Sequence, residues 1–353
     1  MFSFESLELP VIAAPMAGGP STSRLVIDSS RAGGWGMLAG GNKNVDALAD
    51  EVRDIQDAGV AAGVNLFIAG PQSTDAAALA SLRAKMQPVA ERFDVELGEP
   101  TWDDDDYAAK VAWLVAHPVD VVTFTFGLPS DADVTALHAA GSSLGATVTC
   151  LDDARTAVAR GMDFLVVQGP DAGGHRSTFD LHADPDEAPL PDLLEQIRAA
   201  VDVPLLAAGG IATPDDTVAA LGMGAVAVQA GTAFLRSSSA GSSATHRAAL
   251  ASDDFTDTGL TRAFSGRFAR GLVNEFMSMF DGVENVAPSA YPEVNRMLAP
   301  LRRAAAEAGE KRCHDREVGH VGGDRIARQP DERRAAEPAH RHRPAGLHRE
   351  PPE

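Results

Sequence analysis

Short apolar runs alternate with amphipathic segments along most of the chain, and this pattern predicts a parallel α/β fold. The clearest run, 164–168, is rich in valine, and buried parallel strands normally show such continuous apolar sequences. Segments with helical spacing separate the runs, so strands and helices alternate. Eight such repeats predict a closed (β/α)8 TIM barrel. The expected strands are 11–14, 36–39, 62–67, 119–124, 146–150, 164–168, 204–208 and 225–229.

Two parts of the chain depart from this rhythm. Residues 70–100 form a longer excursion within the barrel repeats, and the stretch after residue 235 is rich in Ser, Arg and Phe. We expect 1–235 to form the barrel, completed by a helix at about 290–308, and 236–289 to form a small helical lobe over the barrel mouth. Residues 310–353 are rich in Arg, His and Pro and hold no aromatic residue. Such a segment cannot bury a core, and we expect a disordered tail or the product of a shifted reading frame.

Composition and charge narrow the class of protein. The net charge of −20 disfavours nucleic-acid binding, because phosphate backbones are bound by clustered Lys and Arg. Cys150 and Cys313 lie far apart, so we expect neither a disulfide framework nor a zinc site.

The apolar run 218–235 approaches the length of a membrane span, but its glycines divide it into a helix end, a turn and a buried strand. No secretory signal is visible at the N-terminus, and we expect a cytoplasmic protein.

Four successive aspartates at 103–106 raise the question of a metal site. They lack the alternating ligands and the glycine of a calcium-binding loop. Carboxylates at the beginning of a helix interact favourably with the positive end of its dipole. We therefore interpret the run as the acidic start of a helix at 107–116 and expect no metal.

The carboxyl ends of the expected strands carry the candidate chemistry. TIM barrels bind ligands at these ends, and a phosphate commonly lies in the loops after strands seven and eight. Gly209 and Gly210 follow strand seven, and the sequence Gln-Ala-Gly-Thr at 229–232 ends strand eight. Backbone N–H groups and a hydroxyl there suit a phosphate dianion, although glycines alone are equally consistent with tight barrel turns. Asn65 places an amide in a buried strand, and either the core or a ligand must satisfy it.

His175 is the leading catalytic candidate. Strand six ends at Gln168, and a loop with three glycines then leads to this histidine. The Gly173–Gly174 pair lets the backbone approach a ligand closely, and histidine exchanges a proton readily near neutral pH. By itself, such a histidine could also serve only to hydrogen-bond a loop carbonyl.

Four other residues have weaker claims on a site. Arg236 and Arg267 could attract an anionic substrate, but an arginine is ordinarily solvated. Tyr291 could line the pocket or pack in the core. Cys150, at the end of strand five, is better interpreted as a small buried side chain than as a nucleophile.

Five motifs at the strand ends, taken together, resemble the FMN-dependent nitronate monooxygenase family, formerly called 2-nitropropane dioxygenases. The likeness covers about residues 7–308, and the segment 261–267 resembles bacterial members of the family. Each motif is unspecific alone, but all five occur in the expected order. They are Ala14-Pro15-Met16, Gly63-Val64-Asn65, Gln168-Gly169 with Ala172-Gly173-Gly174-His175, Ala208-Gly209-Gly210-Ile211 and Gln229-Ala230-Gly231-Thr232.

The resemblance implies a non-covalent FMN with Asn65 and Gln168 near the isoalloxazine ring and Met16 packed beside it. It also implies that His175 is the catalytic base, which removes the α-proton of a nitroalkane or orients a nitronate beside the flavin. The other residues implied as cofactor contacts are Gly173, Gly174, Gly209, Gly210, Gln229, Ala230, Gly231 and Thr232.

The expected activity is therefore the oxidation of alkyl nitronates, extending to nitroalkanes, by O2 to carbonyl compounds and nitrite. Two alternatives stay open. One is an FMN- and NADH-dependent reductase of the same superfamily, acting on an enoyl-acyl-carrier-protein or a quinone, and the other is a flavin-binding protein without turnover. We expect small-molecule partners, with no nucleic acid and no membrane, and the sequence indicates no oligomeric state.

Overall fold

A closed barrel of parallel strands forms the centre of the computed structural model, which describes residues 2–280 and 287–309. The expected tail at 310–353 lies outside the described residues. The strands of the barrel sheet are β1 (Val11–Ala13), β2 (Trp35–Gly36), β3 (Leu38–Ala39), β4 (Gly63–Phe67), β5 (Val121–Thr125), β6 (Ser143–Val148), β7 (Phe164–Gln168), β9 (Leu205–Ala208) and β10 (Ala227–Ala230).

The order of these strands confirms the predicted TIM barrel. It runs β2-β1-β10-β9-β7-β6-β5-β4-β3, and every neighbouring pair is parallel. The two end strands, β2 and β3, are joined through Met37 alone. They are therefore two parts of one barrel strand, and their connection closes the sheet into eight strand positions.

Helices surround the barrel because each strand presents apolar side chains to both of its faces. Val121, Val166 and Leu206 face an inner cluster that Phe4 fills at the amino ends of the strands, while their chain neighbours face the helices. Four of the barrel helices begin with a side chain that accepts a hydrogen bond from the backbone N–H three residues further on: Thr22, Asn44, Ser130 and Thr213. The barrel helices are α1 (Ser23–Arg31), α2 (Val45–Asp57), α4 (Tyr107–Ala116), α5 (Asp131–Ala140), α6 (Leu151–Ala159), α7 (Leu190–Arg198) and α8 (Pro214–Gly222).

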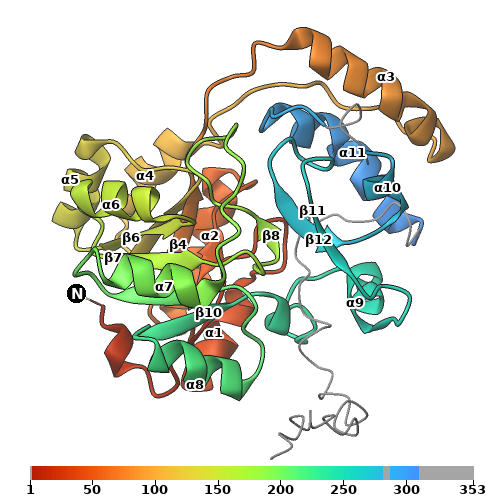
Figure 1. The fold of residues 1–353 in the computed structure, drawn as a ribbon. Coiled ribbons are helices and arrows are strands. Elements are labelled where there is room, and N and C mark those ends of the chain that lie inside the picture. The colour runs from red at the N-terminus through yellow and green to blue at the C-terminus, as the bar shows by residue number, and fades with distance from the viewer. Residues whose placement is uncertain (1, 281–286, 310–353) are drawn as a thin grey trace, which may run out of the picture.

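A lobe packs beside the carboxyl ends of the barrel strands (Figure 1). It differs from the expected helical lobe at 236–289, because that segment contributes two strands of a three-stranded antiparallel sheet as well as helices. The third strand of this sheet is β8 (Gly174–His175), which comes from the barrel loop that follows β7. The other lobe elements are α3 (Ala76–Arg92), α9 (Ala244–Ala251), β11 (Thr258–Thr261), β12 (Ala269–Leu272), α10 (Glu275–Ser278) and α11 (Glu293–Glu307).

The packing of α3 and α11 also differs from expectation. Residues 70–100 were assigned no helix, yet α3 spans 17 residues and packs in one apolar cluster with α10 and α11. Figure 1 shows α3 lying over α11, far from its neighbours in sequence. Four of its nine exposed residues are alanine, so the contrast between an apolar and a polar face, which marks a helix in sequence, is weak. α11 therefore belongs mainly to the lobe core rather than completing the ring of barrel helices.

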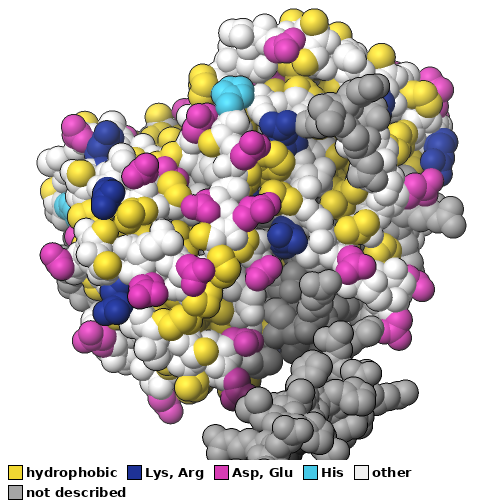
Figure 2. All heavy atoms as spheres, viewed as in Figure 1, with side chains coloured by type: hydrophobic (Ala, Val, Ile, Leu, Met, Phe, Trp, Pro, Cys, Tyr) yellow, Lys and Arg dark blue, Asp and Glu magenta, His cyan; other side chains and the backbone are white. Residues whose placement is uncertain are grey.

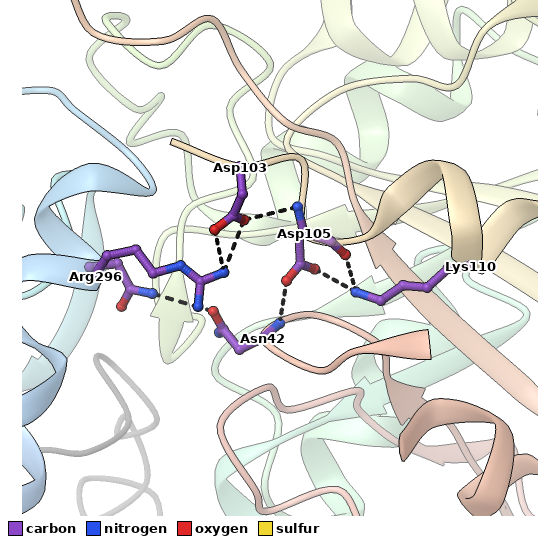
Figure 3. A network of polar contacts seen from close by, with 6 residues as sticks. Asn42, Asp103, Asp105, Lys110 and Arg296 are labelled. Carbon is purple, nitrogen blue, oxygen red and sulfur yellow. Dashed lines mark hydrogen bonds and ion pairs between the residues drawn. The ribbon is translucent and has the colours of Figure 1, made fainter. Parts of the chain in front are cut away.

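The aspartates at 103–106 connect the lobe to the barrel (Figure 3). Asp103 binds Arg296 of α11 at 2.8 Å, and Asp105 binds the buried Lys110 of α4 at 2.9 Å. The backbone N–H of Asn42 donates to Asp105 at 2.9 Å. α4 begins directly after the run, as predicted, but the carboxylates serve in ion pairs as well as at a helix start.

The apolar run at 218–235 is divided as predicted. It contains the end of α8, the buried strand β10 and the short 3-10 helix η2 (Thr232–Phe234). Within residues 2–280 and 287–309, no helix is both long and apolar enough to span a membrane. On the face shown in Figure 2, acidic side chains outnumber basic ones and are scattered over the surface, which gives no basic patch for a phosphate backbone.

Candidate active site

A pocket opens at the carboxyl ends of the barrel strands. The strand ends of β1, β4, β5, β7, β9 and β10 contribute to its lining, together with the loop that carries β8. The structure brings all of the residues proposed from sequence to this pocket: Met16, Asn65, Gln168, Gly173, Gly174, His175, Gly209, Gly210, Gln229, Ala230, Gly231 and Thr232. Their individual roles stay predictions.

His175 is held at the pocket wall by both barrel and lobe. Its backbone pairs with Ala269 of β12, and its Nε2 lies 2.8 Å from the Oγ of Ser265. Ser265 is fully buried, which fixes the position of its hydroxyl. The rings of Phe126 and Tyr291 meet the imidazole edge-on, with centroids 5.5 and 5.6 Å away. The orientation of the imidazole is therefore set before any ligand binds.

The Gln168 side chain holds the loop that carries His175. Its Nε2 donates to the carbonyl of His175 at 3.0 Å, and its Oε1 accepts from the N–H of Ser177 at 3.0 Å. Beneath the loop, the buried Arg176 donates to the carbonyls of Gly169 and Asp186. Burial, and secondarily the charge of a neighbouring arginine, lowers the pKa of Arg176 to about 10. The Gln168 amide at the end of β7 thus has a clear structural function in addition to lining the pocket.

Asn65 is satisfied by the core. Its Nδ2 donates to the hydroxyls of Thr123 and Thr125 at 3.0 and 2.9 Å. Both threonines lie on the adjacent strand β5. The sequence left open whether the core or a ligand satisfies the Asn65 amide. Hydroxyls within the barrel satisfy it, and the residue also lines the pocket.

The loops after β9 and β10 have the features of a site for a phosphate-bearing ligand. Gly209 and Gly210 adopt φ of 104° and 71°, and a Cβ on Gly209 would lie 2.9 Å from the backbone nitrogen of Ala172. No Lys or Arg of the described residues lines the pocket, so a phosphate would depend there on backbone N–H groups and on the Thr232 hydroxyl. The buried Oε1 of Gln229 has no hydrogen-bond partner in the described part of the chain. A buried amide oxygen requires a partner, and a polar cofactor in the pocket would supply one.

Sequence reasoning missed Phe67, Phe126 and Ser265. Phe67 ends β4, and Phe126 follows the end of β5 directly. The strand-end rule that selected Gln168 therefore also applied to these two aromatic residues. Ser265 gave no comparable signal, because it reaches His175 from 90 residues away in the sequence.

The expectation of a solvated arginine holds for Arg236 and is wrong for Arg267. Arg236 is exposed, whereas only 2% of Arg267 is accessible to solvent. The Arg267 guanidinium donates to the carbonyl of Thr178 at 2.7 Å and lies over the ring of Phe126, which together explain its burial. Tyr291 packs in an aromatic cluster beside His175.

Cys150 lies half-buried at the start of α6. Burial, as the largest cause, raises the pKa of its thiol above the ordinary value. The thiolate is the nucleophilic form of cysteine, so these surroundings favour the inert role that the sequence suggested.

The fold and the pocket together define a class of enzyme, the TIM barrels that bind a phosphate-bearing cofactor at the carboxyl ends of their strands. The family model described as nitronate monooxygenase matches residues 3–330. A probable nitronate monooxygenase of Staphylococcus aureus (strain Newman) is 35% identical over 313 residues, which cover 87% of this chain and 86% of that relative. The chain therefore belongs to the nitronate monooxygenase family, a family of flavin-dependent oxidoreductases.

Solved structures agree with this assignment. The nitroalkane oxidase from Streptomyces ansochromogenes superimposes with a TM-score of 0.84 and 38% sequence identity, covering 90% of this chain and 92% of that one. FabK from Thermotoga maritima superimposes with a TM-score of 0.66 and 25% identity, covering 90% and 87%. The first of these shares both more sequence and more structure with the present chain.

Proposed function

We propose that this protein uses FMN and O2 to oxidise alkyl nitronates, and nitroalkanes of the same skeleton, to carbonyl compounds and nitrite. The observation that carries the proposal is the imidazole of His175, which Ser265 contacts at the wall of the pocket that also contains every proposed cofactor contact. Gln168 holds the backbone of the same residue. The substrates are small molecules. We place the reaction in the cytoplasm, in keeping with two cysteines that lack disulfide spacing.

The pocket suits FMN at both of its ends. We assign the phosphate to the N–H groups at Gly209 and Gly210 and to the hydroxyl of Thr232, and the ring to the compartment lined by Met16 and Asn65. When bound, FMN would supply the redox chemistry between the substrate and O2. The chain contributes binding, orientation and proton transfer.

His175 is proposed to remove the α-proton of a neutral nitroalkane. The hydroxyl of Ser265, 2.8 Å from Nε2, keeps the imidazole in a fixed orientation during this transfer. With a nitronate, which has already lost the proton, His175 orients the anion. The surrounding rings of Phe126 and Tyr291 keep bulk water from the reacting carbon. Burial raises the pKa of the Tyr291 hydroxyl above its ordinary value, so Tyr291 stays neutral in this site.

Anaerobic stopped-flow spectroscopy of the yellow holoprotein tests the proposal against the reductase alternative. We expect the flavin absorbance to change rapidly when an alkyl nitronate is mixed in and to change slowly, if at all, with NADH. Rapid bleaching by NADH, with no response to the nitronate, would favour the reductase. A flavin that responds to neither compound would favour a binding protein without turnover.

Substitution of Gly209 by alanine is expected to weaken flavin binding about tenfold, because a left-handed backbone is strained in any other residue by ~1–3 kcal/mol. The added Cβ would also contact the Ala172 nitrogen at 2.9 Å. The dissociation constant can be measured by flavin fluorescence during titration of the apoprotein. Gly222→Ala is the matched control, since a Cβ at the end of α8 has no neighbour within 4 Å. Equal flavin affinity in both variants would contradict the assignment of this loop.

A further inference from the structure

Phe126 has a strained backbone on the wall of the pocket. Its φ is 77°, in the left-handed region that is unfavourable for a bulky side chain. The backbone N–H donates to the Oγ of Ser177 at 3.2 Å, and the residue is 2% exposed. Strained backbone of this kind persists only where the surroundings impose it, and it concentrates at functional sites. The conformation thus calls for an explanation beyond packing.

The ring of Phe126 joins the pocket to a buried charge. Its centroid lies 5.5 Å from that of His175 and 4.6 Å from that of Phe67, and all three residues line the pocket. The guanidinium carbon of Arg267 lies over the same ring, 4.1 Å from the centroid. These distances place the guanidinium no more than about 10 Å from the imidazole, close enough for a charge in a dry environment to act there.

Among residues 2–280 and 287–309, Arg267 forms no ion pair with a carboxylate. Its guanidinium donates to the carbonyl and hydroxyl of Thr178, and its buried Nε has no hydrogen-bond partner in the same part of the chain. Burial lowers the pKa of Arg267 to about 10, against the opposing effects of Tyr291 and Asp180. The side chain therefore remains charged at neutral pH. Buried charges are normally paired, because an unpaired one is costly, so the described residues leave a positive charge without a directly bonded carboxylate behind the aromatic wall of the pocket.

We propose that Phe126 and Arg267 form an anion-selecting wall, in which the guanidinium, acting through the ring, favours a planar oxyanion over a neutral molecule of the same shape. The edge of an aromatic ring carries partial positive charge, and a cation over its face increases that polarisation. The proposal rests on the proposed function, in which it makes the nitronate rather than the neutral nitroalkane the preferred form of the substrate. Both residues determine specificity, while His175 remains the group that transfers the proton.

Nitrate is a suitable probe, since it is a planar oxyanion that the enzyme cannot oxidise. We would measure its dissociation constant for the flavin-loaded protein by titration calorimetry, in the wild type and in Arg267→Met, Arg267→Lys and Arg302→Met. Methionine removes the charge but keeps an unbranched side chain against Phe126. Arg302 is the matched control, because it too is buried and donates to backbone carbonyls, but in the lobe core.

We expect Arg267→Met to weaken nitrate binding about tenfold, which corresponds to ~1.4 kcal/mol. Arg267→Lys should recover most of the affinity for nitrate. Arg302→Met should lower the melting temperature and leave the affinity for nitrate unchanged. In steady-state assays, Arg267→Met should raise KM for an alkyl nitronate about tenfold and change KM for the matching nitroalkane less than about twofold. Unchanged nitrate affinity in a folded Arg267→Met protein, or equal changes in both KM values, would overturn the proposal.

A second variant keeps the proposal testable if Arg267→Met does not fold. Phe126→Leu retains the guanidinium but removes the ring, and it should weaken nitrate binding at least ~3-fold; unchanged binding would refute the role of the ring. The nitrate titration needs no turnover. If the protein binds nitrate as predicted but does not oxidise nitronates, the result would support the anion-selecting wall and contradict only the proposed function.

Discussion

Replacing His175 by asparagine is expected to lower kcat/KM for a neutral nitroalkane by ~10²–10⁴-fold, the range that general-base catalysis contributes. The imidazole is suited to accept the α-proton near neutral pH, and asparagine cannot accept it. Asparagine is nevertheless small and polar, and the substitution keeps the backbone pairing of residue 175 with Ala269. The protein should therefore remain yellow, with flavin content and melting temperature close to those of the wild type. Initial rates at several pH values provide the measurement.

The same variant should lose much less activity with preformed nitronates, because their α-proton is already gone. Ser265→Ala is a useful companion, since it leaves the imidazole in place but removes the hydroxyl 2.8 Å from Nε2. It should show a smaller loss with nitroalkanes than His175→Asn. Wild-type rates with nitroalkanes in the His175→Asn protein would rule out His175 as the base.

Among substitutions that break one of the described ion pairs, removal of the Lys110 side chain should lower the free energy of unfolding the most. Its side chain is 1% exposed and binds Asp105 at 2.9 Å. Lys110→Met leaves the Asp105 carboxylate buried without its partner, and breaking a buried pair in this way typically costs ~3–5 kcal/mol. Urea unfolding would measure the free energy of unfolding. Arg155→Met removes an exposed pair with Asp152 and should change it by less than ~1 kcal/mol.

The pH dependence of this variant gives a second check. Burial raises the pKa of Asp105 above its ordinary value, and Lys110 opposes that rise. A carboxyl whose pKa is higher in the folded than in the unfolded protein binds a proton more tightly when folded, so its ionisation costs stability as the pH rises. Without Lys110 the pKa should rise further. The loss of stability in Lys110→Met should therefore be larger at pH 7 than at pH 5, and the opposite trend would contradict the pairing.

The sequence predicted the barrel well because its signals are local. The strand at 164–168 and the helix at 107–116 have the bounds observed for β7 and α4, since a run buried on both faces and an acidic helix start are each specified by neighbouring residues. The strand predicted at 146–150 is observed as β6, which spans Ser143–Val148 and thus begins three residues earlier. Its first residues, Ser143 to Gly145, are buried but include a hydroxyl and a glycine, so they lack an apolar signature.

The site was predicted in part for a related reason. His175, Gln168 and the glycines follow strand ends, where the barrel rule places ligands. Ser265 and Arg267 come from the lobe and contact His175 and Phe126, which line the pocket, beside the pairing of β12 with β8. That pairing joins segments about 90 residues apart, and the register between short, irregular strands has no sequence marker. Interactions of this kind require the tertiary structure.

Oxygen uptake by the purified yellow protein in the presence of an alkyl nitronate tests the central claim most directly. We predict uptake that requires bound flavin, needs no NADH and is accompanied by nitrite in amounts equal to the nitronate consumed. A flavin-loaded protein that consumes no oxygen and releases no nitrite with alkyl nitronates would contradict the proposed function.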